Sequence, residues 1–338
     1  MERTGGVPRY PMRQEQETGM GFLKNGVWHD EWDHNDEESG TFERDESAFR
    51  NWVTPDGSAG PTGKAGFKAE PGRYRLYISL ACPWAHRVNV ARHLKGLTDA
   101  IELVVVHWLM KEGGWSFRSG ECATPDPLMD ADNLHQIYTA AKPDYSGHVT
   151  VPVLWDTKTG TIVNNESADL LRMLGSAFDE CGAKPLDLYP AAHREEIDAL
   201  NDRIYGAVNN GVYKAGFATS QSAYDEAIGP LFTVLDELEN RLEGRDWLIG
   251  DTLTETDIRL WTTLIRFDPV YHTHFKCNVR RIADYPNLAA LTRRLYALDG
   301  VAETVNFHHI RHHYYESHTH INPNGIVPKG PVPLIPGA

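Results

Sequence analysis

Residues 74–87 constrain the fold more strongly than any other part of this 338-residue chain. Aromatic and branched residues at 74–80 favour a β-strand. Apolar residues then recur at helical spacing over 84–94, and Pro83 suits the first helical turn, where its missing N–H has no partner in any case. The pattern therefore predicts that Cys82 lies where a strand ends and a helix begins.

This position favours a reactive cysteine. Unpaired backbone N–H groups and the positive end of a helix dipole stabilise a thiolate, and His86 and Arg87 would add positive charge one turn later. A small, buried, unreactive cysteine is the alternative. Position 85 is alanine, so Cys82 cannot form the internal disulfide of a Cys-x-x-Cys site. A mixed disulfide at Cys82 would need an outside thiol to resolve it, and glutathione is the natural candidate.

The segments that follow predict a thioredoxin-like domain. Residues 101–108 form a second apolar, strand-like run that we expect to lie parallel to the first. Residues 149–156 and 161–163 predict an antiparallel pair, and a helix begins at about residue 167. Between these halves, residues 111–148 form a long insertion, and long loops in compact domains are usually functional.

Two positions in the second half of this domain are candidates for ligand binding. Val151-Pro152 stands at the start of a strand, where thioredoxin-like folds hold a cis-proline beside the reactive cysteine, although only a minority of X-Pro bonds are cis. Glu166-Ser167 stands at the start of a helix, whose backbone N–H groups can bind a carboxylate. The other interpretation of Ser167 is an ordinary helix cap.

The remainder of the chain is helical in pattern. Apolar residues recur at helical spacing over 191–208 and 224–242, and a capping box of Thr254 and Asp257 predicts a helix over 258–267. We therefore expect an α/β domain followed by an all-α domain. The predicted divisions are an N-terminal extension (1–60), the thioredoxin-like domain (61–178), the all-helical domain (190–320) and a proline-rich tail (321–338).

Composition excludes several classes of function. A formal net charge of −14 argues against nucleic acid as a partner. No apolar run approaches 18 residues, so we expect no membrane span, and the polar N-terminus lacks the apolar centre of a secretory signal.

The four cysteines are widely spaced without a Cys-x-x-Cys pair, which fits a reducing cytoplasm. Histidines at 308–318 have no cysteine near them, and we expect no metal.

Together these features resemble a cytosolic glutathione transferase. Seven blocks resemble, more narrowly, the Xi class, the glutathionyl-hydroquinone reductases. They are residues 82–87, 113–117, 149–156, 164–167, 209–217, 267–271 and 321–328. The resemblance runs from about Gly21 to the C-terminus, with His148 in place of an expected arginine and Asn324 in place of an expected threonine.

The resemblance implies a specific reaction. Members of this family reduce glutathionyl-hydroquinones to hydroquinone and oxidised glutathione, here through a Cys82–glutathione mixed disulfide. It further implies a homodimer, with glutathione as co-substrate. The implied glutathione-binding residues are Trp115, Val151, Pro152, Glu166 and Ser167, and the candidates for the hydroquinone pocket are Tyr213, Tyr271, Tyr314 and Tyr315.

Two alternatives remain open at this stage. An omega-like thiol transferase or dehydroascorbate reductase would use the same cysteine, so Cys82 does not discriminate between them. A non-catalytic, transferase-like binding module is a different class. Such modules tend to lose the reactive residue, which is present here.

Overall fold

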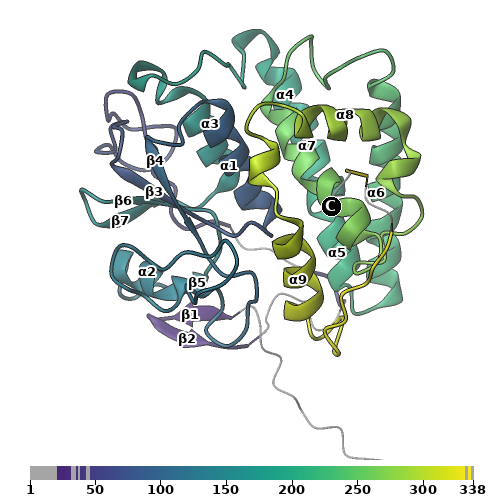
Figure 1. The fold of residues 1–338 in the computed structure, drawn as a ribbon, viewed down its shortest axis with the longest axis horizontal. Coiled ribbons are helices and arrows are strands. Elements are labelled where there is room, and N and C mark those ends of the chain that lie inside the picture. Colours follow the sequence, from purple (N-terminus) through teal and green to yellow (C-terminus); the bar gives the residue numbers. More distant parts are fainter. Residues whose placement is uncertain (1–20, 32–35, 37–38, 43–45, 332–333, 336–338) are drawn as a thin grey trace, which may run out of the picture.

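The protein is described from a computed structural model, and the described residues are 21–31, 36, 39–42, 46–331 and 334–335. A half that contains the sheets lies beside a half made of helices (Figure 1). The central sheet has four strands in the order β4-β3-β6-β7. No helix in the described residues is long and apolar enough to cross a membrane.

The predicted strand–helix–strand unit is confirmed. Strand β3 (Tyr74–Ile78) pairs in parallel with β4 (Ile101–Val105), and helix α1 (Pro83–Leu94) connects them. Strand β6 (Val153–Asp156) runs antiparallel to β3 and forms the expected hairpin with β7 (Thr161–Asn164). Four of the five residues of this inner strand are buried, which explains why its sequence is almost continuously apolar.

The insertion is more ordered than a loop. It contains α2 (Leu134–Ala141), which begins with a capping box, and the short strand β5 (Gly147–His148). Strand β5 joins β1 (Phe22–Lys24) and β2 (Val27–His29) in a second sheet. The turn between β1 and β2 has positive φ at Asn25 (50°) and at Gly26 (77°), as an Asn-Gly hairpin requires.

Helix α3 (Ser167–Ser176) completes the first half, and six α-helices of the described residues build the second half. The capping box of Thr254 and Asp257 starts α7, as predicted. Two π-helical turns, Tyr205–Asn209 and Phe267–Tyr271, follow α4 and α7 and end those regular helices earlier than the sequence pattern indicates. The six helices are α4 (Arg194–Ile204), α5 (Gly211–Phe217), α6 (Gln221–Arg241), α7 (Glu255–Arg266), α8 (Pro286–Tyr296) and α9 (Phe307–Ser317).

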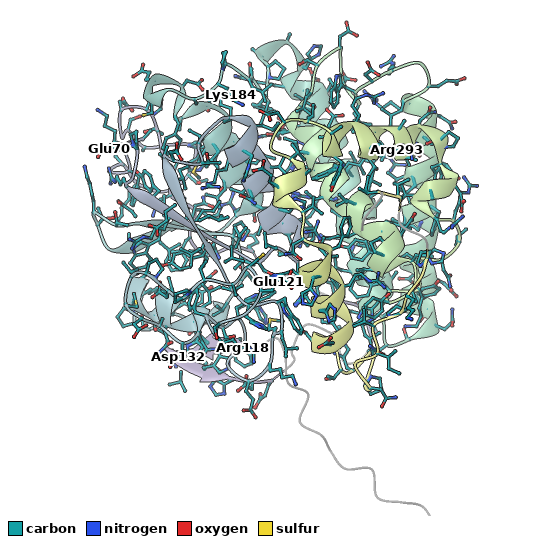
Figure 2. All side chains as sticks on the ribbon, viewed as in Figure 1. Glu70, Arg118, Glu121, Asp132, Lys184 and Arg293 are labelled. Atoms are coloured by element: carbon teal, nitrogen blue, oxygen red, sulfur yellow. The ribbon has the colours of Figure 1, made fainter. Side chains whose placement is uncertain are left out.

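Helix α1 lies between the two halves. It packs against α3 on one side and α7 on the other. The insertion also crosses to the helical half, because Glu121, which is drawn beside α9 in Figure 2, contacts the ring of His309 through its carbonyl oxygen. The N-terminus of α1, which carries Cys82, is therefore close to groups from both halves.

Candidate active site

Cys82 stands at the predicted junction. It is the residue before the first turn of α1, with extended backbone angles, and its carbonyl accepts the first helical hydrogen bond from His86 N (3.0 Å). The side chain is half-buried, and its Sγ lies 3.6 Å from the carbonyl oxygen of Val151. A sulfur held at a helix N-terminus and open on one side can act as a nucleophile.

The Val151-Pro152 bond is cis and lies directly beside this sulfur. Residue Thr150 just before it is fixed by Tyr138, whose hydroxyl donates to the Thr150 carbonyl (2.8 Å) and accepts from its N–H (3.2 Å). Asn165 Nδ2 donates to the same hydroxyl (3.1 Å). The edge of the sheet that faces Cys82 is therefore anchored by insertion helix α2.

The positive charge expected from His86 is absent. His86 is buried, and its burial, together with the Arg266 guanidinium, holds its pKa well below the ordinary value. Arg266 Nη1 donates to His86 Nδ1 (2.9 Å), and His86 Nε2 donates to Thr304 Oγ1 (2.7 Å). The expectation was wrong because a neighbouring cation and a dry environment both disfavour the imidazolium.

Arg266 is a buried cation that contacts the loop before Cys82. It ends α7, is 0% exposed, and donates to the carbonyls of Ala81 (2.7 Å) and Leu80 (3.0 Å), directly before the cysteine. No local pattern in the sequence indicates this contact. Only its place one residue before the block at 267–271 could have drawn attention to it.

Arg87 does supply charge near α1. It is buried, its guanidinium stacks 4.5 Å from the centre of the Trp84 ring, and its Nη2 donates to Asn209 Oδ1 (2.7 Å). Burial lowers the pKa of Arg87 to about 9, so the group is still protonated at neutral pH. One of the two predicted cations is therefore present.

Glu166 and Ser167 lie at the start of α3. Glu166 caps the helix by accepting from Ala168 N (3.0 Å), and Ser167 is its first residue. The extension crosses this point, because Ser47 Oγ donates to Glu166 Oε2 (3.0 Å) and Arg50 makes a bidentate ion pair with Asp169. The extension therefore contributes contacts at the start of α3.

Trp115 is held from two sides. Its ring stacks on His313 of α9, with 4.8 Å between ring centres. The loop before it is fixed by Asp30, whose Oδ1 accepts from Gly113 N (2.8 Å). Gly113 (φ 78°) and Gly114 (φ 70°) adopt left-handed backbone angles that favour glycine. The N-terminal hairpin and the helical half thus both position this residue.

Three of the four predicted tyrosines meet at their hydroxyls. Tyr314 OH lies 2.5 Å from Tyr213 OH and 3.1 Å from Tyr271 OH. Burial raises the pKa of Tyr271 and of Tyr314 well above the ordinary value, so both stay protonated. We call Tyr213, Tyr271 and Tyr314 the phenol cluster. Tyr315 points elsewhere, since its hydroxyl donates to the Pro269 carbonyl (3.3 Å).

The phenol cluster contacts the first turn of α1 through Trp84. The Trp84 ring, two residues after Cys82, lies 6.4 Å from the ring centre of Tyr213. Protonated phenols can donate hydrogen bonds to an oxygen that becomes negative during a reaction. The arrangement therefore combines a nucleophilic sulfur with donors for a phenolate.

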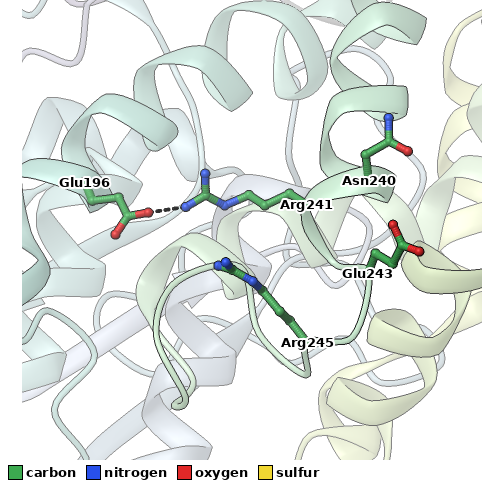
Figure 3. A pocket seen from close by; sticks show the side chains of 5 residues that line it. All are labelled: Glu196, Asn240, Arg241, Glu243 and Arg245. Atoms are coloured by element: carbon green, nitrogen blue, oxygen red, sulfur yellow. Dashed lines mark hydrogen bonds and ion pairs between the residues drawn. The ribbon is translucent and has the colours of Figure 1, made fainter.

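The described residues contain no group of three or more His, Cys, Asp or Glu side chains that could hold a metal ion. A surface pocket elsewhere in the helical half is lined by Glu196, Asn240, Arg241, Glu243 and Arg245. An ion pair between Glu196 and Arg241 spans it (Figure 3). None of the predicted site residues lines this pocket.

Comparisons with known proteins agree on one family. Residues 81–177 match the family model "Glutathione S-transferase, N-terminal domain", and residues 221–294 match "Glutathione S-transferase, C-terminal domain". The chain is 58% identical over 313 residues to glutathionyl-hydroquinone reductase YqjG of Escherichia coli, covering 92% of this chain and 95% of that protein. It is 52% identical over 318 residues to glutathionyl-hydroquinone reductase PcpF of Sphingobium chlorophenolicum, covering 94% and 98%.

Solved structures give the same result. The glutathione-bound structure of YqjG matches with a TM-score of 0.86 and 55% identity, over 92% of this chain and 96% of that one. A Xi class glutathione transferase from Natrialba magadii also matches with a TM-score of 0.86, at 48% identity over 92% and 94%. The predicted thioredoxin-like half followed by a helical half is confirmed. The chain belongs to the Xi class of glutathione transferases, the family that includes the glutathionyl-hydroquinone reductases.

Proposed function

We propose that this chain uses glutathione to reduce glutathionyl-hydroquinones to hydroquinones. The observation that carries the proposal is the meeting of three phenol hydroxyls, from Tyr213, Tyr271 and Tyr314, next to the helix turn that holds Cys82. A thiol transferase that acts on disulfides needs the cysteine alone. A substrate that leaves as a phenol also needs donors for its oxygen.

The reaction takes two steps. The Cys82 thiolate attacks the sulfur of the conjugate, and a sulfur–sulfur bond forms as the bond between that sulfur and the ring carbon breaks. Before this attack, the ring carbon that carries the sulfur takes up a proton and a ring hydroxyl releases one, so the electron pair of the broken bond passes through the ring to that oxygen. The resulting phenolate is then protonated, and the ring is reduced by two electrons. A second glutathione then attacks the mixed disulfide as its thiolate, which releases oxidised glutathione and restores the Cys82 thiolate.

The other site residues bind and orient these groups. We propose that the Val151 backbone, next to Pro152, pairs with the cysteinyl backbone of glutathione, and that Trp115 contacts the tripeptide. Glu166 and Ser167 take the γ-glutamyl end at the start of α3. The phenol cluster donates to the hydroquinone oxygens, whereas Tyr315 packs against His274 outside the cluster.

We further propose that the enzyme is a cytoplasmic homodimer with the domain divisions 61–178 and 190–320, and that it needs neither metal nor nucleic acid. The dimer rests on family membership. Light scattering at micromolar concentration tests it directly, since a monomer mass of 38.0 kDa contradicts it. Activity that survives treatment with a chelator is the expected result for a metal-free site.

The decisive experiment is reduction of a glutathionyl-hydroquinone by glutathione, with wild type beside Cys82→Ser. Cys122→Ser is the matched control, because Cys122 is an exposed cysteine in the insertion. We expect hydroquinone release by wild type and the control, and none by Cys82→Ser. If wild type instead reduces only dehydroascorbate or a simple mixed disulfide, the protein is an omega-like thiol transferase.

A further inference from the structure

Arg266 connects the helical half to the backbone that carries the nucleophile. Its guanidinium makes four hydrogen bonds with no exposed surface: Nε to the Ala81 carbonyl, Nη2 to the Leu80 carbonyl, and Nη1 to both the Thr262 carbonyl and His86 Nδ1. The distances are 2.7 to 3.0 Å. The two carbonyls that directly precede Cys82 therefore both face this one cation.

Among the residues that the structure describes, no fixed anion balances the charge of Arg266. No carboxylate of the described residues forms an ion pair with it, and its other partners are carbonyls and a neutral imidazole. A buried charge without a counter-ion is costly. Such a cation is best compensated by an anion that is present in the working enzyme, and a Cys82 thiolate would stand one residue after the carbonyls that Arg266 binds. Arg87 is the second buried cation that interacts with the charge of Cys82.

The neutral form of His86 strengthens this interpretation. Thr304 Oγ1 donates to the Val301 carbonyl (2.6 Å), so it accepts the proton from His86 Nε2 (2.7 Å). His86 Nδ1 is then the acceptor for Arg266. Each hydrogen bond from Arg266 through His86 to Thr304 therefore has a defined donor and acceptor. These bonds hold the guanidinium against α1, whose first turn follows Cys82.

We propose that Arg266 is a positioning residue that fixes the loop before Cys82 and stabilises negative charge on the Cys82 sulfur. The proposal is independent of the substrate, and only its kcat readout rests on the proposed function.

The test is the pH dependence of Cys82 alkylation by iodoacetamide, followed by mass spectrometry of the Cys82 peptide. In Arg266→Met we expect the half-maximal pH to rise by about one unit, which slows alkylation about tenfold at pH values below it. Arg266→Lys keeps the charge, so its half-maximal pH stays near that of wild type. Its kcat with a glutathionyl-hydroquinone falls, because one ammonium cannot hold both carbonyls and His86.

Arg92→Met is the matched control. Arg92 is another buried arginine, on α1, and among the described residues it donates to the carbonyls of Ile101 and Thr98. We expect it to lower the melting temperature without changing the alkylation profile. If Arg266→Met does not fold, Arg266→Gln removes the charge while keeping an amide donor.

An unchanged half-maximal pH in a folded, uncharged variant overturns the proposal and leaves Arg266 a structural residue. Since alkylation needs no substrate, this outcome is separate from failure of the proposed function, which shows as a wild-type enzyme that releases no hydroquinone. If Arg266→Lys keeps the full wild-type kcat, Arg266 does not position the loop.

Discussion

The cysteine end and the phenol end of the site differ in the kind of group that surrounds the reacting atoms. At the cysteine end, Cys82 is half-buried and its surroundings are backbone groups: the start of α1 and the carbonyl of Val151. At the phenol end, Tyr213, Tyr271 and Tyr314 are buried side chains that contact one another through their hydroxyls. A nucleophile needs access and a stabilised anion, whereas a proton donor needs a dry site that keeps it protonated. Because of this difference, substitutions should be able to remove the nucleophile and the hydrogen-bond donors separately.

Removal of the cysteine should have the largest effect. We expect Cys82→Ser to lose about a thousandfold or more in kcat/KM, because a serine hydroxyl cannot form the mixed disulfide. The loss should apply equally to a glutathionyl-hydroquinone and to a simple mixed disulfide such as glutathionylated mercaptoethanol. Steady-state rates with both substrates check this, and a selective loss would contradict a shared nucleophile.

Removal of the Tyr314 hydroxyl should reduce activity with one class of substrate and leave the other class unaffected. Tyr314 contacts both other hydroxyls of the phenol cluster, so we expect Tyr314→Phe to lower kcat for the glutathionyl-hydroquinone about 10- to 100-fold. Reduction of a simple mixed disulfide should stay near wild type, because no phenolate leaves in that reaction.

The matched control for this variant is Tyr315→Phe. Its hydroxyl is bonded to the Pro269 carbonyl, outside the phenol cluster, and we expect less than about a threefold change in kcat. Equal losses in the two variants would mean that the cluster has no special role in the reaction.

The N-terminal hairpin should have a smaller effect on glutathione binding. Asp30 accepts from both Trp28 Nε1 and Gly113 N, at 2.8 Å each. We expect Asp30→Ala to loosen the Trp115 loop and raise the KM for glutathione about three- to tenfold, with kcat little changed. Asp56→Ala, at an exposed turn of the extension, is the control. An unchanged KM would exclude the hairpin from glutathione binding.

The free energy of unfolding should depend on pH through the buried histidines next to the phenol cluster. Burial lowers the pKa of His274 to about 3 and of His313 to about 4. Since the unfolded chain binds these protons at higher pH, the free energy of unfolding falls as pH drops from about 6.5 towards 4, by up to about 1.4 kcal/mol per unit for each group.

Asp257 has the opposite effect on the free energy of unfolding. Burial raises its pKa to about 6, so the folded protein takes up this proton at a higher pH than the unfolded chain. Urea denaturation at pH 7.5, 6 and 5 measures the net slope. His274→Gln should flatten it, and an unchanged slope would mean that this histidine is already charged in the folded protein.

Much of the fold follows from local pattern. The strand–helix unit around Cys82, the Asn25-Gly26 turn and the capping box of Thr254 depend on residues within a few positions of one another, and the structure contains all three. The family resemblance extended this to the two-part architecture. The order inside the insertion was missed, because α2 and β5 are short and β5 exists only through its pairing with β1.

The sequence by itself determined that a cysteine stands at a helix start, because backbone geometry over a few residues is set by local sterics and hydrogen bonds. Tertiary structure alone decided which tyrosines converge, that Tyr315 turns away, and that the charge beside the cysteine loop comes from Arg266 rather than His86. These contacts join residues as many as 185 positions apart. Burial and packing between the two halves select them, and neither can be deduced from the residues near Cys82.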